Sequence, residues 1–275
     1  MRWVLKRGWM YVAMVVVSTF ALFPVYWVVI TSLKPRSEIY TRTPDLWPSD
    51  PQWHQYPRVL GEGHVGRALL NSAIVATGTM VICLLVASMA AYALARYRFR
   101  MRTLLLVLVL MTQMFPLVVL VIPLFVIMRK ADLLDTYWSL IITYLAFSVP
   151  LAIWVMRGFI VSIPEELEYA ARIDGATRIG AMWRVVLPLA APGLATTAVL
   201  SFLEGWKEFL LALTFMNTES RKTVPVVLQS FVGRGDVDWG AVMATSVLYT
   251  LPVALVFVLA RKHLMTARTA GAVTG

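Results

Sequence analysis

The chain has 275 residues, of which 59% are hydrophobic and 15% charged, and its mean hydropathy is +0.73. A soluble domain of this length cannot bury so much apolar surface in one core, so the composition excludes an ordinary soluble globular protein. The formal net charge is +10, but no basic patch with interleaved aromatic residues lies on a soluble stretch, so we expect no nucleic-acid partner.

Six apolar stretches are each long enough to cross a hydrocarbon layer of roughly 30 Å as a helix. They predict an all-α membrane protein with about six transmembrane helices, at residues 9–32, 70–95, 103–128, 137–161, 194–215 and 241–262. The first stretch follows Arg2, Lys6 and Arg7, as a secretory signal would. Its apolar run is too long for a signal core and no small-residue cleavage site closes it, so we expect a retained helix. Cys83, the only cysteine, excludes a disulfide framework and a thiol metal site.

The segments between these stretches differ in length. Residues 33–67 contain five prolines and two tryptophans, which is typical of an extended external loop. Residues 157–193 have helical character instead, and we expect them to form an internal loop. Helix kinks are expected at three prolines within the apolar stretches: Pro116, Pro123 and Pro150.

The basic residues predict which way the chain crosses the membrane. With both termini in the cytoplasm, the inward segments carry 14 Lys and Arg residues and the outward segments carry 10. The inward segments are 1–8, 96–102, 157–193 and 261–275, and the outward segments are 33–67, 129–136 and 216–240. Because basic residues concentrate on the cytoplasmic side, we expect a multi-pass protein with both termini cytoplasmic, and most of its positive charge near anionic lipid.

The internal loop contains local signals for two short helices. Ser162 and Glu165 form a capping-box pattern, which predicts a helix start. Gly175 supplies a stop, because glycine adopts a left-handed turn at little cost. A second helical run, 179–187, is expected to end at Pro188. Such an element suits docking into a groove on another protein, and it equally suits an amphipathic connector lying on lipid.

The same loop resembles the EAA loop of ABC importer permeases, in which Glu-Ala-Ala is followed at fixed spacing by Gly and by Leu-Pro. Tyr169 occupies the position of the motif glutamate, and Glu168 precedes it. The resemblance implies that the loop docks on a cytoplasmic ATPase through Glu168, Tyr169, Ala170, Ala171, Asp174, Gly175, Leu187 and Pro188. Glu168 and Tyr169 differ by about 100° around a helix, so one does not simply replace the other.

Further short segments, in chain order, are similar to the carbohydrate branch of these permeases, the maltose type. They are Asn71-Ser72, residues 91–99, Pro116 with 122–125, Pro150 with 153–154, 206–209 and the tail 269–275. The resemblance implies a MetI-like importer permease, with one permease domain over 1–275, located in the bacterial inner (plasma) membrane. It further implies transport of a di- or oligosaccharide, and as partners a second permease subunit, a cytoplasmic ATPase dimer, an extracytoplasmic sugar-binding protein and the lipid bilayer.

Signatures of catalysis are missing from the sequence. No Gly-Lys dipeptide occurs, so no phosphate-binding loop can be written. His54, His64 and His263 are scattered and form no His-Glu-x-x-His pattern, and no Gly-x-Ser-x-Gly elbow occurs. We therefore expect a chain that is not an enzyme and binds no metal or cofactor, with ATP and Mg held by the partner ATPase.

Three ionisable residues fall within the fifth apolar stretch: Glu204, Lys207 and Glu208. Charges exposed at the bilayer centre cost roughly 2.5–3.5 kcal/mol each, so these should face protein or water. Their spacing predicts one shared helix face. The face is either a self-neutralising Glu–Lys pair plus one carboxylate, or, with Trp206 nearby, the border of a sugar path.

Two other classes of function are open to a chain of this composition. A secondary transporter driven by an ion gradient predicts repeated halves with broken midplane helices, and the sequence shows no such symmetry. A membrane-embedded enzyme needs catalytic residues at membrane depth, where only the group at 204–208 could begin one. Transport stimulated by a separate ATPase would exclude both.

Overall fold

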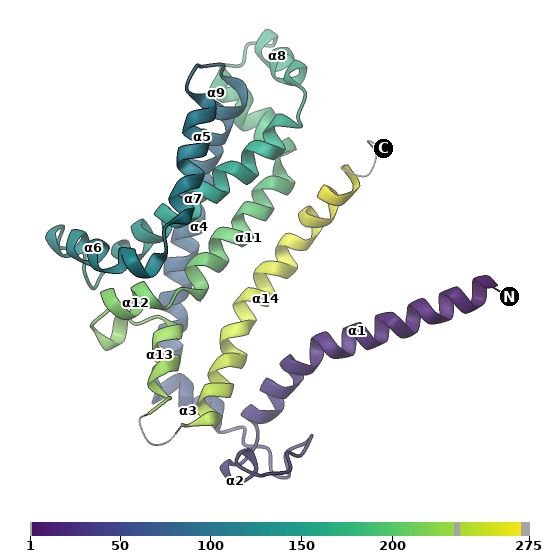
Figure 1. The fold of residues 1–275 in the computed structure, drawn as a ribbon, viewed down its shortest axis with the longest axis vertical. Helices are drawn as coiled ribbons and strands as arrows, with labels where there is room; N and C mark the ends of the chain where they lie inside the picture. The colour runs from purple at the N-terminus through teal and green to yellow at the C-terminus, as the bar shows by residue number, and fades with distance from the viewer. Residues whose placement is uncertain (1, 234–236, 271–275) are drawn as a thin grey trace. The chain divides into compact units, whose positions relative to one another are not determined.

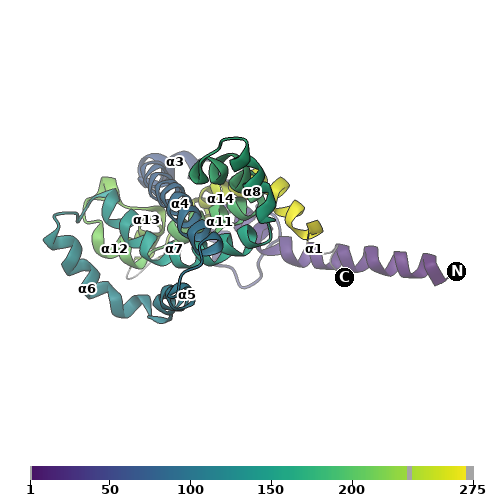
Figure 2. The same ribbon diagram turned by 90° about the horizontal axis from the view of Figure 1, so that it is seen from above.

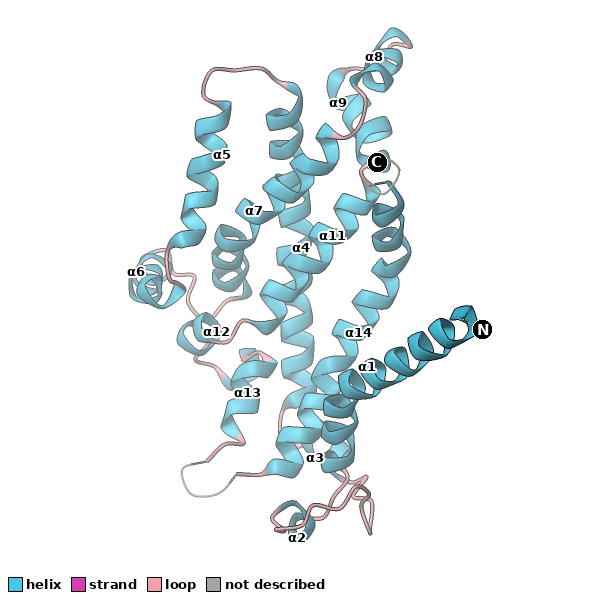
Figure 3. Cartoon of the chain, turned by 45° about the vertical axis from the view of Figure 1, so that its right-hand side comes forward, coloured by secondary structure: helices cyan, strands magenta, loops and turns pink. Residues whose placement is uncertain are grey.

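The computed structural model describes residues 2–233 and 237–270, with side chains over 9–233 and 237–262. These residues are helical apart from loops and one isolated bridge between Val232 and Val237, as Figure 3 shows. Two compact units are formed, one from residues 1–66 and 227–251, the other from 67–226 and 252–275. The single permease domain expected over 1–275 stays a prediction.

The first unit begins with helix α1 (Arg2–Ser32), whose apolar side chains are largely exposed from Trp9 to Val25. The loop expected at 33–67 contains two short helices, α2 (Arg36–Ile39) and α3 (Gln55–Gly61). The unit also contains most of α13 (Val224–Ser230) and the first part of α14 (Trp239–Ala270). Within it, Arg58 forms an ion pair with Asp238 at 2.6 Å.

The second unit is built around three long helices. These are α4 (Val65–Arg96), α7 (Tyr137–Val161) and α11 (Ala191–Lys207). Helices α7 and α11 run side by side (Figure 1). Gly193 permits this approach, because a Cβ built there would lie 2.6 Å from the Phe159 ring.

Among the described residues, four helices are long and apolar enough to span a membrane, and two bent helix pairs bring the number to six if each is one span. The four are Trp9–Ser32, Val65–Arg96, Tyr137–Val161 and Trp239–Lys262. This count confirms the fold class predicted from hydropathy. The sequence predicted one helix over 103–128 and one over 194–215, and each of these stretches is divided into two helical segments in the structure.

The third span consists of α5 (Arg102–Met111), a 3-10 turn η1 (Thr112–Met114) and α6 (Leu117–Lys130), bent by 98°. In the view of Figure 2, α5 is seen end-on while α6 runs across the picture. The break lies at Phe115–Pro116: Pro116 lacks an amide hydrogen and disfavours a helical conformation at Phe115, which is extended. The expected kink at Pro116 is therefore confirmed, whereas Pro123 lies within α6 and Pro150 within α7.

The expected helix over 194–215 stops at Lys207, and a separate short helix, α12 (Leu210–Phe215), follows. Glu208 between them is extended, with ψ of 129°. At its other end α11 is joined to the preceding helical segment through an 80° bend at Ala190.

Residues 162–190 form the loop between α7 and α11, which the sequence predicted over 157–193 as an internal loop. Helix α8 (Glu165–Ile173) is followed by a tight turn at Gly175, whose backbone φ is +93°. The Ala176 amide donates to the Ala171 carbonyl and the Gly175 amide to the Arg172 carbonyl, the two bonds of a Schellman motif. The glycine stop is confirmed.

The expected capping box at Ser162 is wrong. Ser162 ends α7, where its hydroxyl donates to the Phe159 carbonyl at 2.7 Å, and Ile163 continues this turn by bonding to Ile160. Helix α8 begins after Pro164 without a side-chain cap.

The expected end of the second run at Pro188 is also wrong. Helix α9 (Arg178–Ala181), a π-helical turn (Met182–Val186) and α10 (Leu187–Leu189) continue through it. Pro188 lies in the first turn of α10, where a missing amide hydrogen costs least.

At the end of the second unit away from α8, a loop over 216–224 is held by side chains from α4 and from the segment before α7. The buried Asn71 amide donates to the carbonyls of Ser220 and Lys222, at 2.9 and 2.8 Å. Asp135 accepts hydrogen bonds from Asn217 and Thr218. Partial burial raises the pKa of Asp135, but these hydrogen bonds and the Arg221 guanidinium outweigh it and hold the pKa below its usual value.

Candidate functional site

The first candidate site is α8 with its surroundings, where Glu168 occupies an unusual position. Glu168 is the one side chain of α8 that is buried. Its carboxylate accepts a hydrogen bond from Nε of Arg96 at 3.0 Å and another from the Tyr92 hydroxyl. Arg96 also donates to the Ile163 carbonyl at 2.9 Å. The Arg96 and Glu168 side chains are 8% and 10% exposed, so this ion pair is almost removed from solvent.

The neighbouring residue, Tyr169, points the other way. Its ring is exposed, and its hydroxyl donates to the Glu165 carboxylate at 3.2 Å. Farther along, Arg178 lies over the Tyr97 ring at 5.4 Å. These side chains surround a small cavity of about 70 Å³ together with Tyr92, Arg96, Glu168 and Arg172.

The structure thus separates the residues predicted to contact an ATPase into two groups. Tyr169, Ala170, Asp174, Gly175 and Pro188 are exposed and Ala171 is partly exposed. Glu168 and Leu187 are buried, Leu187 in an apolar cluster with Met156, Ile160, Met182 and Val186. An outward-facing Glu168 is therefore excluded in this structure, because its carboxylate is paired with Arg96.

The second candidate site lies at the break after α11. Lys207 donates to the Glu204 carboxylate at 2.8 Å, one turn away, and both side chains are exposed to a large extent. Glu208 is bound differently: its carboxylate accepts from the Tyr144 hydroxyl at 2.7 Å and from the backbone amides of Leu211 and Ala212. The expected shared face of three residues is wrong for Glu208, because the helix ends before it.

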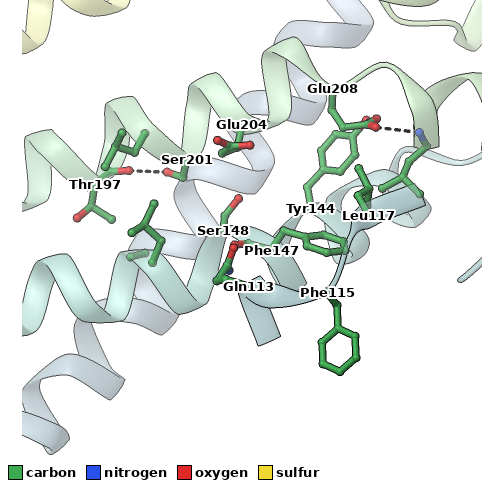
Figure 4. Close-up of a pocket in the computed structure, with 14 residues that line it drawn as sticks. Gln113, Phe115, Leu117, Tyr144, Phe147, Ser148, Thr197, Ser201, Glu204 and Glu208 are labelled. Atoms are coloured by element: carbon green, nitrogen blue, oxygen red, sulfur yellow. Dashed lines mark hydrogen bonds between the residues drawn. The ribbon is translucent and has the colours of Figure 1, made fainter. Parts of the chain in front are cut away.

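A cavity of about 270 Å³ lies beside this break. Figure 4 shows Glu204, Ser148 and Gln113 converging on it from α11, α7 and η1, with the Tyr144 ring next to Glu208. Its wall contains Gln113, Phe115, Leu117, Tyr144, Phe147, Ser148, Leu151, Ala152, Thr197, Leu200, Ser201, Glu204, Glu208 and Leu211. The combination of aromatic rings, hydroxyls, an amide and carboxylates can hydrogen-bond a polyhydroxylated molecule and pack against its carbon skeleton.

Two residues predicted beside this path lie elsewhere. Trp206 is 2% exposed and stacks on Phe202, with ring centroids 5.4 Å apart, so it belongs to the protein core. Lys207 does not line the cavity. Trp206 follows Glu204 by two positions, which is about 200° around an α-helix, so the Trp206 side chain lies on the opposite side from Glu204. Lys207 follows Glu204 by three positions and pairs with it outside the cavity.

Sequence reasoning missed most of the polar wall. Gln113, Ser148 and Ser201 are polar residues inside apolar stretches, which is a usable signal. Nothing local indicates that they share one cavity, because that depends on the bends at Pro116 and Glu208. The hydroxyls of Ser148 and Thr197 are buried without a hydrogen-bond partner in the structure, so the wall retains unused hydrogen-bonding capacity.

The sequence predicted no metal ligands in this chain. Over the described part of the chain, no three His, Cys, Asp or Glu side chains gather where they could hold a metal ion. The expectation that the chain binds no cofactor stays a prediction.

Comparison with known proteins places these features in context. Residues 83–267 match the family described as binding-protein-dependent transport system inner membrane component. The sulfoquinovosyl glycerol transport system permease protein SmoH of Agrobacterium fabrum is 37% identical over 254 residues, which cover 92% of this chain and 89% of that protein. The trehalose transport system permease protein SugB of Mycobacterium tuberculosis is 37% identical over 258 residues, covering 93% of each.

Two further similarities extend over nearly the whole chain. The trehalose/maltose transport system permease protein MalG of Thermococcus litoralis is 35% identical over 99% of this chain and 98% of its own length. Among solved structures, a chain of a bacterial ABC transporter involved in the import of the acidic polysaccharide alginate superposes with a TM-score of 0.79 at 25% identity. That superposition covers 94% of this chain and 96% of the other.

Proposed function

Since the chain belongs to the family of binding-protein-dependent transport system inner membrane components, we propose that it carries a di- or oligosaccharide into the cytoplasm by means of a separate ATPase. The chain is a multi-pass permease subunit of a sugar ABC importer. The relatives named above are permease proteins for several different sugars, and none is named as an enzyme.

The observation that carries the ATPase coupling is the exposed surface of α8 and its Gly175 turn. Tyr169 and Ile173, one turn apart, are 53% and 86% exposed. An apolar and aromatic strip of this kind on a short helix outside the long apolar helices supports docking against another protein. Residues 162–188 are therefore the element through which ATP-driven motion of the partner enters this chain.

The partners follow from what the chain lacks. A phosphate-binding loop cannot be written in its sequence, so ATP and Mg belong to a cytoplasmic ATPase dimer. A second permease subunit completes the pore, and an extracytoplasmic binding protein delivers the sugar. Exposed apolar side chains along α1 support contact with lipid or with that second subunit. Both termini lie in the cytoplasm, and the membrane is the bacterial inner membrane.

The cavity at the helix break is the part of this chain closest in chemistry to a sugar path. Glu204 and Glu208 line it together with hydroxyl and aromatic groups. At about 270 Å³ it lies just below the range of small-molecule sites, so it suits one sugar ring at a time.

Reconstitution tests the function directly. The chain is co-expressed with the second permease, the ATPase and the binding protein from the neighbouring genes, and the complex is placed in liposomes with ATP inside. We expect uptake of a radiolabelled di- or oligosaccharide that needs ATP and all four components, and neither ATPase activity nor uptake from the chain alone. Uptake that persists without ATP and collapses with the ion gradient would show a secondary transporter instead, and ATP hydrolysis by the isolated chain would contradict the proposal.

A further inference from the structure

Helix α8 is attached to the rest of the chain in a different way from the helices that follow it. Along α9, the π-helical turn and α10, the buried side chains are apolar: Ala181, Met182, Val186 and Leu187. Along α8 the buried side chain is a carboxylate, Glu168. A polar contact with α4 therefore takes the place of a hydrophobic anchor under this helix.

The polar contact joins two particular helix segments. Arg96 ends α4, and Glu168 lies in the middle of α8, 72 residues later. Both oxygens of the Glu168 carboxylate are used, one by Arg96 and the other by Tyr92, one turn earlier in α4. Arg96 additionally holds the carbonyl of Ile163, in the link that precedes α8. We call Tyr92, Arg96 and Glu168 the α4–α8 latch.

The segments that flank α8 have no helical structure. Ser162–Pro164 separates α8 from α7, and the Gly175 turn with residues 176–177 separates it from α9. A nine-residue helix between two such links is marginal by itself, so its position depends on contacts made by its side chains. The latch is the direct side-chain contact through which a force on α8 passes into α4.

We infer that Arg96 and Glu168 are positioning residues for coupling: they hold α8 on the end of α4, so that motion of the partner ATPase is transmitted first to α4. This inference rests on the proposed function. It assigns Glu168 to the inside of the permease and leaves contact with the partner to Tyr169, Ile173 and their exposed neighbours. The latch thus sets how tightly ATP hydrolysis is linked to transport, and it does not bind the partner.

The test is the ratio of sugar moved to ATP hydrolysed in the reconstituted complete complex. Glu168→Gln keeps the size of the side chain but removes the charge that pairs with Arg96. We expect the ATPase to stay bound and active while the ratio falls by roughly tenfold, within the 5- to 150-fold span of typical coupling between sites. The control is Arg98→Gln, which removes a charge from an exposed side chain just beyond the end of α4 and should leave the ratio unchanged.

A removable link separates positioning from simple stability. In an Arg96→Cys/Glu168→Cys variant the latch is absent, and a short bis-methanethiosulfonate cross-linker can replace it; Cys83, the only native cysteine, is buried. One sample, first cross-linked and then treated with reductant, should gain and then lose coupling with no change in the amount of assembled complex. This comparison decides the question even where Glu168→Gln lowers the yield.

The outcomes distinguish the inference from the function it rests on. A wild-type complex without ATP-dependent uptake contradicts the proposed function. A wild-type complex that transports sugar, with Glu168→Gln at the same ratio or with equal coupling before and after reduction of the cross-link, overturns the latch alone. A loss of ATPase binding in Glu168→Gln would assign Glu168 to the partner interface and would also overturn it.

Discussion

Glu168 and Glu208 each accept a hydrogen bond from a tyrosine of a neighbouring helix, Tyr92 in α4 and Tyr144 in α7. Their remaining partners differ. Glu168 faces the guanidinium of Arg96, while Glu208 is held by two backbone amides at the start of α12. One carboxylate is paired with a cation and closed off from solvent, and the other is held by backbone amides beside a cavity.

The difference shows how one residue type serves two tasks in the same chain. A buried ion pair depends on both members, since removing one leaves a charge that the low-dielectric surroundings do not solvate. A carboxylate that caps a helix depends on dipoles, and its loss costs less. Disruption at Glu168 should therefore change the position of a helix, while disruption at Glu208 should change the cavity with a smaller effect on stability.

The largest effect is expected where the ion pair is broken from the Arg96 side. Arg96→Met preserves much of the aliphatic length but leaves the Glu168 carboxylate buried without its cation, at a cost of about 3–5 kcal/mol. Because α8 has no other buried side chain, the cost should be relieved by release of α8. Hydrogen exchange of the α8 amides should then approach that of unstructured backbone, while α7 and α11 stay protected.

Arg98→Met is the control for this experiment. Arg98 lies two residues beyond Arg96 on the same connecting segment, and its side chain is exposed. Exchange in α8 should be unchanged in this variant. Equal protection of α8 in the wild type and in Arg96→Met would mean that the ion pair does not hold the helix.

Substitutions of Glu208 should lower the stability of the protein less than Arg96→Met does, by an amount that depends on how many acceptor oxygens remain. Glu208→Leu removes the acceptor for two α12 amides and for the Tyr144 hydroxyl, which we expect to cost about 2–3 kcal/mol. Glu208→Gln keeps one acceptor oxygen and should cost about 1 kcal/mol. Thermal unfolding of the purified complex measures both. If the cavity borders the sugar path, Glu208→Leu should also reduce uptake by more than it reduces assembly.

Glu204→Leu is the matched comparison for this pair. Glu204 lines the same cavity, but its partner Lys207 is 64% exposed, and such a surface pair contributes about 0–1 kcal/mol. Its loss should leave the unfolding temperature nearly unchanged. A drop as large as that of Glu208→Leu would remove the distinction between the two carboxylates.

Hydropathy and local turn signals predicted the elements that depend on a short stretch of chain. Six apolar stretches follow from composition alone, and Gly175 stops α8 because only glycine adopts its φ at little cost. The break at Glu208 could not be predicted in this way, because Phe209 to Leu213 continue the apolar pattern. The extended conformation there is stabilised by the carboxylate that caps α12.

The contacts of the candidate-site residues could not be predicted from the sequence, for a related reason. Glu168 was singled out by its place next to the motif, yet its partner Arg96 is distant in sequence, and no spacing rule connects them. Trp206 was expected at the cavity because of its type, whereas packing against Phe202 places it in the core. Pairing across helices depends on tertiary structure, which local patterns do not encode.

A smaller effect than that of Glu208→Leu is expected at the Gly175 turn, where a pure backbone term can be isolated. A Cβ at Gly175 would meet nothing within 4 Å, so Gly175→Ala introduces no clash and acts only through the φ of +93°. A left-handed conformation costs an alanine about 1–2 kcal/mol, and asparagine tolerates it better, so Gly175→Asn should lie between alanine and the wild type. The expected readouts are increased hydrogen exchange at the end of α8 and a modest fall in the ratio of sugar moved to ATP hydrolysed.

Gly158→Ala is the control: a Cβ at Gly158 also meets nothing within 4 Å, but Gly158 lies inside α7, where alanine is the better helix former. That variant should be neutral or slightly stabilising. If both alanine variants behaved alike, the turn would not define where α8 ends, and the α4–α8 latch alone would have to fix the position of the helix.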